Sequence, residues 1–178
     1  MSQMLLSEAV VFPERFRAAC EEFLAQYWHD RRWEMEQEFG VMDLPPGEDV
    51  RRFMVADVLR QIAQAAAGES EHLERGEVYE CCQTLCERLF AAPGIGAGYY
   101  IPQEFWEAPI GQVMARAFIW LEGDELITMS QAAEISGRSA SALSQLVDRR
   151  KLTVYPDPDE PNPRRRNRVR RSEIEKLK

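Results

Sequence analysis

Apolar residues recur every three or four positions in four stretches of the first 123 residues, and this periodicity constrains the fold more than any other feature. Such spacing places apolar side chains on one face of an α-helix, which must then pack against other elements. With short connections between them, residues 1–123 are predicted to form an all-α helical bundle. The stripes are Phe12, Phe16, Cys20, Phe23, Leu24 and Tyr27; Val50, Phe53, Met54, Val58, Ile62 and Ala65; Val78, Cys82, Leu85, Cys86, Leu89 and Phe90; and Ile110, Val113, Met114, Ala117, Phe118 and Leu121.

Glycine and proline residues indicate where these helices begin and end. Gly68 follows the second stripe, and a left-handed glycine after the last apolar residue is a common helix end. Pro109 precedes the fourth stripe, where its missing N–H group is not needed in the first turn of a helix. The first helix is predicted to end by Gly40, with a break or bend at residues 30–32 as an open alternative.

Shorter elements with clear helix-start signals begin after residue 123. Thr128 and Gln131 are typical of a capping box, in which each side chain binds the backbone N–H group of the other residue. A short helix is predicted to follow and to end at Gly137. Ser139 is predicted to cap a second helix over residues 139–149. The buried side of that helix is expected to carry Leu143, Leu146 and Val147.

A β-hairpin and a final helix are predicted for the remaining residues. In Leu152–Tyr155 apolar and polar residues alternate and β-forming residues are frequent, so this segment is predicted to be a strand. After a proline-rich acidic turn, Arg164–Arg171 is predicted to return as its partner. Ser172 and Glu175 have capping-box spacing and predict a terminal helix. This hairpin, paired near Leu152–Tyr155 and Arg166–Arg171, is the only sheet predicted, so the expected fold class is mainly α.

Charge divides the chain at the same point. The net charge is −8, but residues up to Gly123 carry 10 basic and 21 acidic side chains, whereas those from Asp124 onward carry 12 and 9. Six arginines lie within the eight residues of Arg164–Arg171. An acidic body with a basic surface favours contact with nucleic-acid phosphates, since each neutralised phosphate releases counterions. A solvated strand face is the alternative interpretation.

The segment after residue 123 also has the order helix, turn, helix, hairpin, helix. Its residues 126–139 (LITMSQAAEISGRS), 149–152 (RRKL) and 170–174 (RRSEI), together with Tyr155, resemble the excisionase/MerR-type family of winged helix-turn-helix DNA-binding domains. The resemblance covers Leu126–Lys178. We therefore expect two domains, an acidic all-α domain over residues 1–123 and a winged helix-turn-helix domain over residues 124–178.

The resemblance implies that helix 139–149 enters the major groove of double-stranded DNA and that the wing tracks the backbone. Gln145 is then placed to recognise adenine, and the wing arginines are placed to contact phosphates without reading sequence. The expected DNA-binding residues are Arg138, Ala140, Ser141, Ser144, Gln145, Arg149, Arg150, Arg164, Arg165, Arg166 and Arg168.

The segment departs from the family pattern in three places. Ala140 and Gln145 stand where the family often has arginine or another long basic residue. Arg150 replaces a glycine that is common before the wing, so the turn there is expected to differ. The wing tip is lengthened by three acidic residues that phosphates would repel, Asp157, Asp159 and Glu160. A DNA-binding wing requires these carboxylates to point away from the duplex.

These features predict a DNA-binding protein, with a transcriptional regulator as the first expectation and an excisionase-like architectural or recombination factor as the alternative. A further alternative is a protein-interaction module whose helix-turn-helix no longer binds DNA. The weak recognition face, the acidic wing tip and the net charge favour that interpretation. A homodimer, or a protein partner bound through residues 1–123, is expected because one short recognition helix supplies little affinity.

The remaining side chains do not predict an enzyme, a cofactor or a metal site. Cys82 and Cys86 are four residues apart on one predicted helix, but zinc needs four ligands and the two histidines are distant, so packed core thiols are expected. Phe105 and Trp106 are expected to be core residues rather than the lining of a ligand pocket. We find no signal peptide and no apolar run that could span a bilayer, so we expect a cytoplasmic protein.

Overall fold

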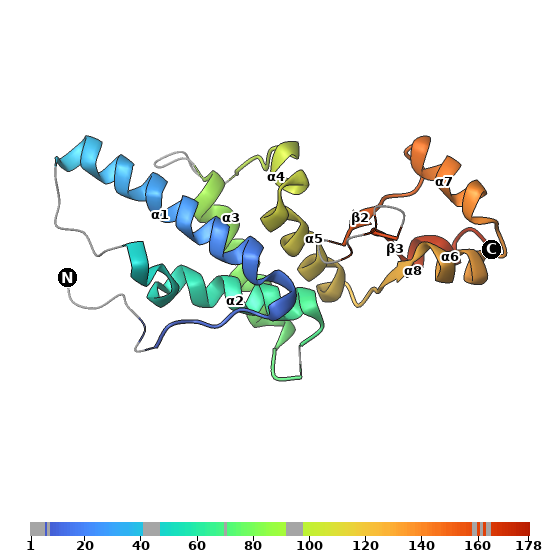
Figure 1. The fold of residues 1–178 in the computed structure, drawn as a ribbon, viewed down its shortest axis with the longest axis horizontal. Coiled ribbons are helices and arrows are strands. Elements are labelled where there is room, and N and C mark those ends of the chain that lie inside the picture. Colours follow the sequence, from blue (N-terminus) through green and yellow to red (C-terminus); the bar gives the residue numbers. More distant parts are fainter. Residues whose placement is uncertain are drawn as a thin grey trace.

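The computed structural model describes residues 6, 8–40, 47–69, 71–91, 98–157, 160, 162 and 165–178. This part of the chain is mainly helical and includes a small three-stranded antiparallel sheet near the C-terminus (Figure 1). The prediction of a mainly α protein with a small sheet in its last third is therefore confirmed.

The elements follow one another in this order along the chain: η1 (Glu14–Phe16), α1 (Arg17–Phe39), η2 (Gly47–Arg52), α2 (Met54–Ala67), α3 (Arg75–Phe90), α4 (Gln103–Glu107), α5 (Pro109–Leu121), β1 (Leu126–Thr128), α6 (Met129–Ser136), α7 (Ala140–Asp148), β2 (Tyr155–Pro156), β3 (Asn167–Arg170) and α8 (Arg171–Glu175), where η denotes a 3-10 helix.

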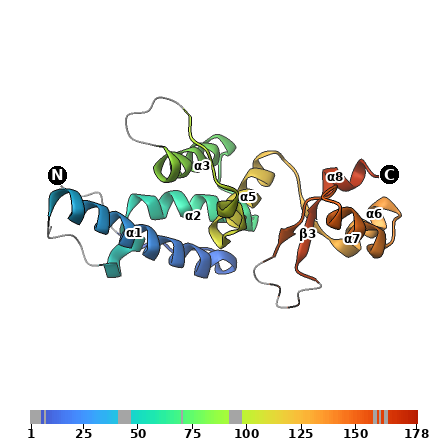
Figure 2. The same cartoon turned by 90° about the horizontal axis from the view of Figure 1, so that it is seen from above.

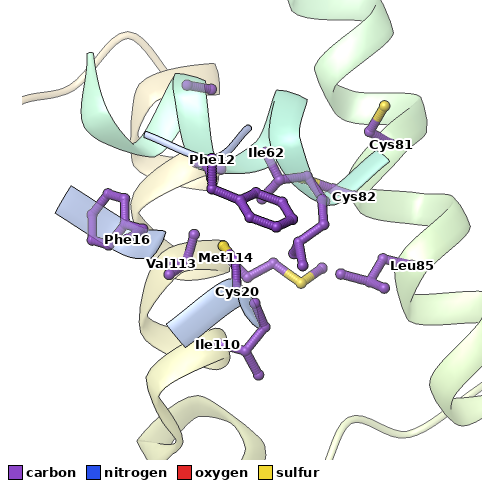
Figure 3. Close-up of a cluster of buried hydrophobic side chains, with 14 of the residues drawn as sticks. Phe12, Phe16, Cys20, Ile62, Cys81, Cys82, Leu85, Ile110, Val113 and Met114 are labelled. Atoms are coloured by element: carbon purple, nitrogen blue, oxygen red, sulfur yellow. The ribbon is translucent and has the colours of Figure 1, made fainter. Parts of the chain in front are cut away.

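The helices up to α5 bury one hydrophobic cluster, and we call this part of the chain, residues 8–121, the helical body. α2 packs against both α3 and α5, while α1 contacts η2, α2 and α5. Figure 3 shows the cluster where Phe16 from η1 and Cys20 from α1 meet Ile62 from α2, Leu85 from α3 and Met114 from α5. These side chains are buried, as their helical spacing predicts.

Most of the predicted helix ends and faces are confirmed. Gly68 ends α2 in a left-handed conformation and Pro109 lies in the first turn of α5. Two details are wrong. The possible break at residues 30–32 is absent, because α1 is a single helix. Met54 is 52% exposed, because α2 turns Val55 and Leu59 inward instead.

A second hydrophobic cluster lies in the C-terminal part of the chain. Figure 2 shows the elements of this part beyond α5. Side chains from β1, α6, α7, β3 and α8 form it, together with Leu152 from the segment between α7 and β2. Its buried members are Ile127, Ala132, Leu143, Leu152, Val169 and Ile174. Leu146 and Val147 pack against it from the predicted inner side of α7.

The sheet has the strand order β1-β3-β2, so the prediction of a hairpin alone is incomplete. β1 pairs antiparallel with β3 and places Ile127 opposite Val169, both buried. β2 is shorter than predicted, since only Tyr155 and Pro156 pair with β3. Leu152, predicted to begin this strand, is instead buried in the second cluster.

Two of the three predicted helix-start signals are confirmed. Thr128 and Gln131 form a reciprocal capping box at α6, and the Ser139 hydroxyl accepts a hydrogen bond from the third backbone N–H group of α7. The prediction of a capping box at Ser172 is wrong. α8 begins one residue earlier, and the Ser172 hydroxyl donates to the Asp124 carboxylate at 2.6 Å.

Candidate nucleic-acid interface

The outer face of α7 carries the residues predicted to read the major groove. Ala140, Ser141, Ser144 and Gln145 are all exposed, whereas Leu143 on the opposite face is fully buried. Because the exposed side chains are small apart from Gln145, another surface could approach the backbone of this helix closely. The Ser139 cap and the packing of Leu143 together fix the orientation of this face.

The end of α7 is basic and has an uncommon backbone conformation. Arg150 has a φ of +54°, in the left-handed region that glycine prefers. Its N–H group donates to the Val147 carbonyl at 2.8 Å, and the next N–H group, from Lys151, donates to the Leu146 carbonyl at 2.8 Å. This pair of hydrogen bonds is typical of the Schellman motif, which normally has glycine at the position of Arg150. Arg150 thus adopts the conformation that glycine usually adopts at this position. Arg149, Arg150 and Lys151 are all exposed.

Arg138, predicted to lie near a phosphate, is engaged within the chain. Its Nε and Nη2 groups donate to the Leu177 carbonyl at 3.3 and 3.2 Å. This contact joins the turn between α6 and α7 to the end of the chain. Arg138 thus serves the packing of α6 and α8 in this structure, although its side chain remains on the surface.

The β2–β3 hairpin, residues Tyr155–Arg170, is organised around Asp157. This residue was expected to be one of three acids at the wing tip that phosphates would repel, but it is only 5% exposed. Its Oδ2 atom accepts from Arg168 at 3.0 Å and from Arg15 of the helical body at 2.9 Å. Arg166 donates through Nε to the Asp157 carbonyl at 3.0 Å. The Asp157 carboxylate therefore points toward the helical body, and Arg168 is paired inside the chain.

The arginines at the end of β3 also have acidic partners. Arg170 pairs with Glu122 and donates to the Tyr155 hydroxyl at 3.1 Å. Arg171 pairs with Glu125 at 3.1 Å and with Glu175 at 3.0 Å. Glu122 and Glu125 belong to the short connection between α5 and β1, so these pairs join the end of β3 to the end of the helical body.

Asp124 lies in the same connection and has a perturbed carboxyl group. Burial acts to raise its pKa, but hydrogen bonds from the Ser172 hydroxyl and from the backbone N–H groups of Glu125 and Ser172, with the positive charge of Arg170, outweigh burial and lower the pKa below its ordinary value. The folded chain thus stabilises the ionised form of Asp124.

A hollow of about 260 Å³ separates the start of α6 from the hairpin. Its lining combines the first residues of α6 with charged side chains of the hairpin: Thr128, Met129, Ser130, Glu160, Arg165 and Arg168. The N-terminus of a helix carries a partial positive charge, and two guanidinium groups add to it. Arg165 and Arg166 are exposed. Arg164 and Asp159, also predicted for this interface, lie outside the described residues.

The cysteines form part of the core, as expected. Cys20, Cys81, Cys82 and Cys86 are free thiols and all are buried. Burial, followed by nearby negative charge, raises the pKa of Cys20 to about 12 and that of Cys81 to about 11, so neither is a thiolate near neutral pH. Among the described residues, no group of His, Cys, Asp and Glu side chains has the geometry to hold a metal ion.

Phe105 and Trp106 pack against the core of the helical body. The Phe105 ring meets Phe90 edge-on at 5.0 Å, and the Trp106 ring lies 6.3 Å from that of Phe118. Two residues of the helical body that contact the hairpin, Arg15 and Arg116, were not predicted from the sequence. Their partners lie far along the chain. No local pattern marks either of them.

Comparisons with protein-family models, curated proteins and solved structures found no match to this chain. None of the helices in the described part of the chain is both long enough and apolar enough to span a membrane.

Proposed function

We propose that the chain is a double-stranded DNA-binding protein of the winged helix-turn-helix type, with α7 in the major groove and the β2–β3 hairpin as the wing. The observation that carries the proposal is the exposed outer face of α7, in a part of the chain that also exposes two clusters of basic side chains. One cluster is Arg149, Arg150 and Lys151 at the end of α7, and the other is Arg165 and Arg166 in the hairpin.

The hollow between α6 and the hairpin supports a backbone contact next to the groove. Arg165 and the first turn of α6 line it, together with Glu160 and with Arg168, which is paired with Asp157. Helix N-termini and arginines both favour phosphate oxygens. The inward orientation of Asp157 also removes one of the three carboxylates expected to repel the duplex. In this proposal residues 124–178 form the DNA-binding domain and residues 1–123 form an acidic domain for self-association or a protein partner.

A second candidate function is a protein-interaction module that does not bind DNA. It is favoured by the pairing of Arg168, Arg170 and Arg171 with carboxylates of the same chain, which reduces the positive charge available to phosphates. Asp148, exposed at the end of α7, also disfavours a close approach of DNA.

The experiment that separates the two candidates is a selection of bound sequences from random duplexes with the full chain, at low and moderate salt. Affinities for a selected and a scrambled duplex then follow from titration. DNA binding predicts enrichment of a motif, and failure to bind any duplex at low salt refutes it in favour of the interaction module. Bending of the selected duplex, measured by energy transfer between its labelled ends, would identify an architectural factor.

Two matched substitutions test the role of α7. Gln145→Glu places a negative charge on its outer face, and we expect it to lower affinity for the selected duplex at least tenfold, because a good base contact contributes about 1–3 kcal/mol. Gln83→Glu makes the same charge change on the exposed face of α3 and is expected to leave affinity nearly unchanged. Equal effects of the two variants would show that α7 does not contact DNA.

The hairpin has its own test. Arg165→Ala and Arg166→Ala are each expected to weaken binding to all duplexes alike and to flatten the slope of log affinity against log salt by about 0.9. Arg17→Ala is the control, since Arg17 is an exposed arginine of the helical body that pairs with Glu14. An unchanged slope in both hairpin variants would exclude the hairpin from the interface.

A further inference from the structure

The helical body contacts the hairpin through polar groups that come from distant parts of the chain. Arg15, just before α1, reaches the Asp157 carboxylate at 2.9 Å, and Arg116 of α5 donates through Nη2 to the Pro156 carbonyl at 2.9 Å. Figure 2 shows the hairpin beside the start of α1. We call Arg15, Arg116, Pro156, Asp157 and Arg168 the hairpin junction.

Two of the residues at this junction are buried, whereas the Arg15 side chain is 35% exposed. Arg116 and Asp157 are each only 5% exposed. The Arg15 guanidinium also lies over the Phe16 ring at 5.3 Å, and Phe16 is fixed in the core of the helical body. Charge-assisted hydrogen bonds of this length are stronger and more directional than neutral ones, particularly where water is partly excluded.

Space remains beside these polar contacts. A hollow of about 490 Å³ lies at the junction, lined by Arg15, Arg116, Asp157 and Arg168 together with Trp120 and residues at the end of α2. The hydrophobic clusters of the helical body and of the C-terminal part have no buried residue in common. The described contacts that join the body to the hairpin at this place are polar.

Asp157 passes this constraint to the arginines of the hairpin. The oxygen that accepts from Arg15 also accepts from Arg168, and the main-chain carbonyl of Asp157 accepts from Arg166. The Asp157 N–H group donates to the Arg166 carbonyl at 2.7 Å, which extends the ladder between the two sides of the hairpin. A shift of Asp157 must therefore shift both arginines.

We infer that Arg15 and Arg116 are positioning residues, through which the helical body sets the place of Arg166 and Arg168 relative to α7. The effect on DNA rests on the proposed function, whereas the effect on the hairpin does not. The helical body then controls the strength of backbone contact without touching DNA itself. A signal that moved the start of α1 would be transmitted to the hairpin by this route.

The first experiment is hydrogen exchange of the full chain, followed by mass spectrometry. Arg15→Gln is expected to speed exchange in peptides covering residues 155–157 and 165–170 by about threefold or more, because local opening becomes easier there. Peptides from α2 and α5 are expected to keep their rates, which also shows that the variant is folded. Arg17→Gln removes the same charge two residues away and is expected to change neither region.

Two further variants separate positioning from a general loss of charge. Arg15→Lys keeps a cation that can reach Asp157 and is expected to retain most of the protection of the hairpin. In an Asp157→Asn background, Arg15→Gln is expected to add no further exchange, as for two residues that act through one contact. Unchanged hairpin exchange in Arg15→Gln, or an equal change in Arg17→Gln, would overturn the inference.

The second experiment measures affinity for the selected and the scrambled duplex. Arg15→Gln is expected to weaken both by about three- to tenfold and to leave the preferred sequence unchanged, because it displaces phosphate contacts rather than base contacts. Faster hairpin exchange with unaltered affinity would refute the control of DNA contact. If the wild-type chain binds no duplex, the proposed function fails and the exchange experiment alone decides whether Arg15 positions the hairpin.

Discussion

Gly111 allows α4 to lie directly against the first turn of α5, and its replacement by alanine provides a quantitative test of that packing. A Cβ atom added at Gly111 would lie 1.7 Å from the Phe105 carbonyl oxygen, 2.6 Å from the Phe105 carbonyl carbon and 2.9 Å from the Trp106 Cα atom. All three are backbone atoms, so no rotation of a side chain relieves the overlap. Either α4 or the start of α5 must move.

The expected cost follows from what such a movement disturbs. Phe105 packs edge-on against Phe90 at 5.0 Å, and Trp106 lies against Phe118, so a displacement of α4 loosens both contacts. Overpacking in a core costs about 1–3 kcal/mol, and the upper end applies here because the overlap involves backbone. The higher helix propensity of alanine offsets about 1 kcal/mol. We therefore expect Gly111→Ala to lower the free energy of unfolding by about 2 kcal/mol.

Gly76 provides the matched control, since it is also a helical glycine but has no atom within 4 Å of an added Cβ. Gly76→Ala in the first turn of α3 is expected to raise the free energy of unfolding by about 0.5 kcal/mol. Urea denaturation followed by tryptophan fluorescence and by circular dichroism measures both variants. The close approach of α4 to α5 would be refuted if Gly111→Ala were neutral or stabilising, as Gly76→Ala is expected to be.

Three further predictions concern the C-terminal part of the chain. Arg150→Gly is expected to raise the free energy of unfolding by about 1 kcal/mol, because the left-handed backbone disfavours arginine. Arg149 has a negative φ, so Arg149→Gly is expected to lower the free energy of unfolding. Urea denaturation of the two variants tests this. Leu143→Ala removes a fully buried side chain and is expected to cost about 2–5 kcal/mol in the same assay. Because the pKa of Asp124 is lowered in the fold, its stabilising effect is present above its unfolded pKa near 4 and is lost as the pH falls through the lower folded value. Ser172→Ala removes the hydrogen bond of the Ser172 hydroxyl, so denaturation curves should differ from wild type above about pH 5 and converge in acid; a constant difference at every pH would contradict this.

The parts of the fold that sequence predicts well are those specified by nearby residues. Helix faces follow from spacing within one helix, and Gly68 and the Thr128–Gln131 pair act on backbone groups only a few residues away. β1 was not predicted from the sequence, for the opposite reason. Leu126–Thr128 is too short to show alternation, and it becomes a strand only because Ile127 meets Val169 across the sheet.

Ser172 shows how a correct local signal can be overridden. Its spacing to Glu175 is that of a capping box, but pairing of β1 with β3 brings the Asp124 carboxylate within 2.6 Å of the Ser172 hydroxyl. A charged acceptor forms a stronger hydrogen bond than a backbone N–H group can offer to the serine oxygen. The competing partner lies in the connection after α5, so no window around Ser172 could have revealed it.

The arginine run shows the same limit for the candidate interface, and it changes what the proposed function requires. Contact of all six arginines with phosphates would give a salt slope of about −5. The structure pairs Arg168, Arg170 and Arg171 with carboxylates, which makes them part of the connection between the hairpin and the helical body. Exposed cations remain at the end of α7 and at Arg165 and Arg166. A DNA-binding role therefore depends on where the helical body holds the hairpin relative to α7 and not on the number of arginines in the run.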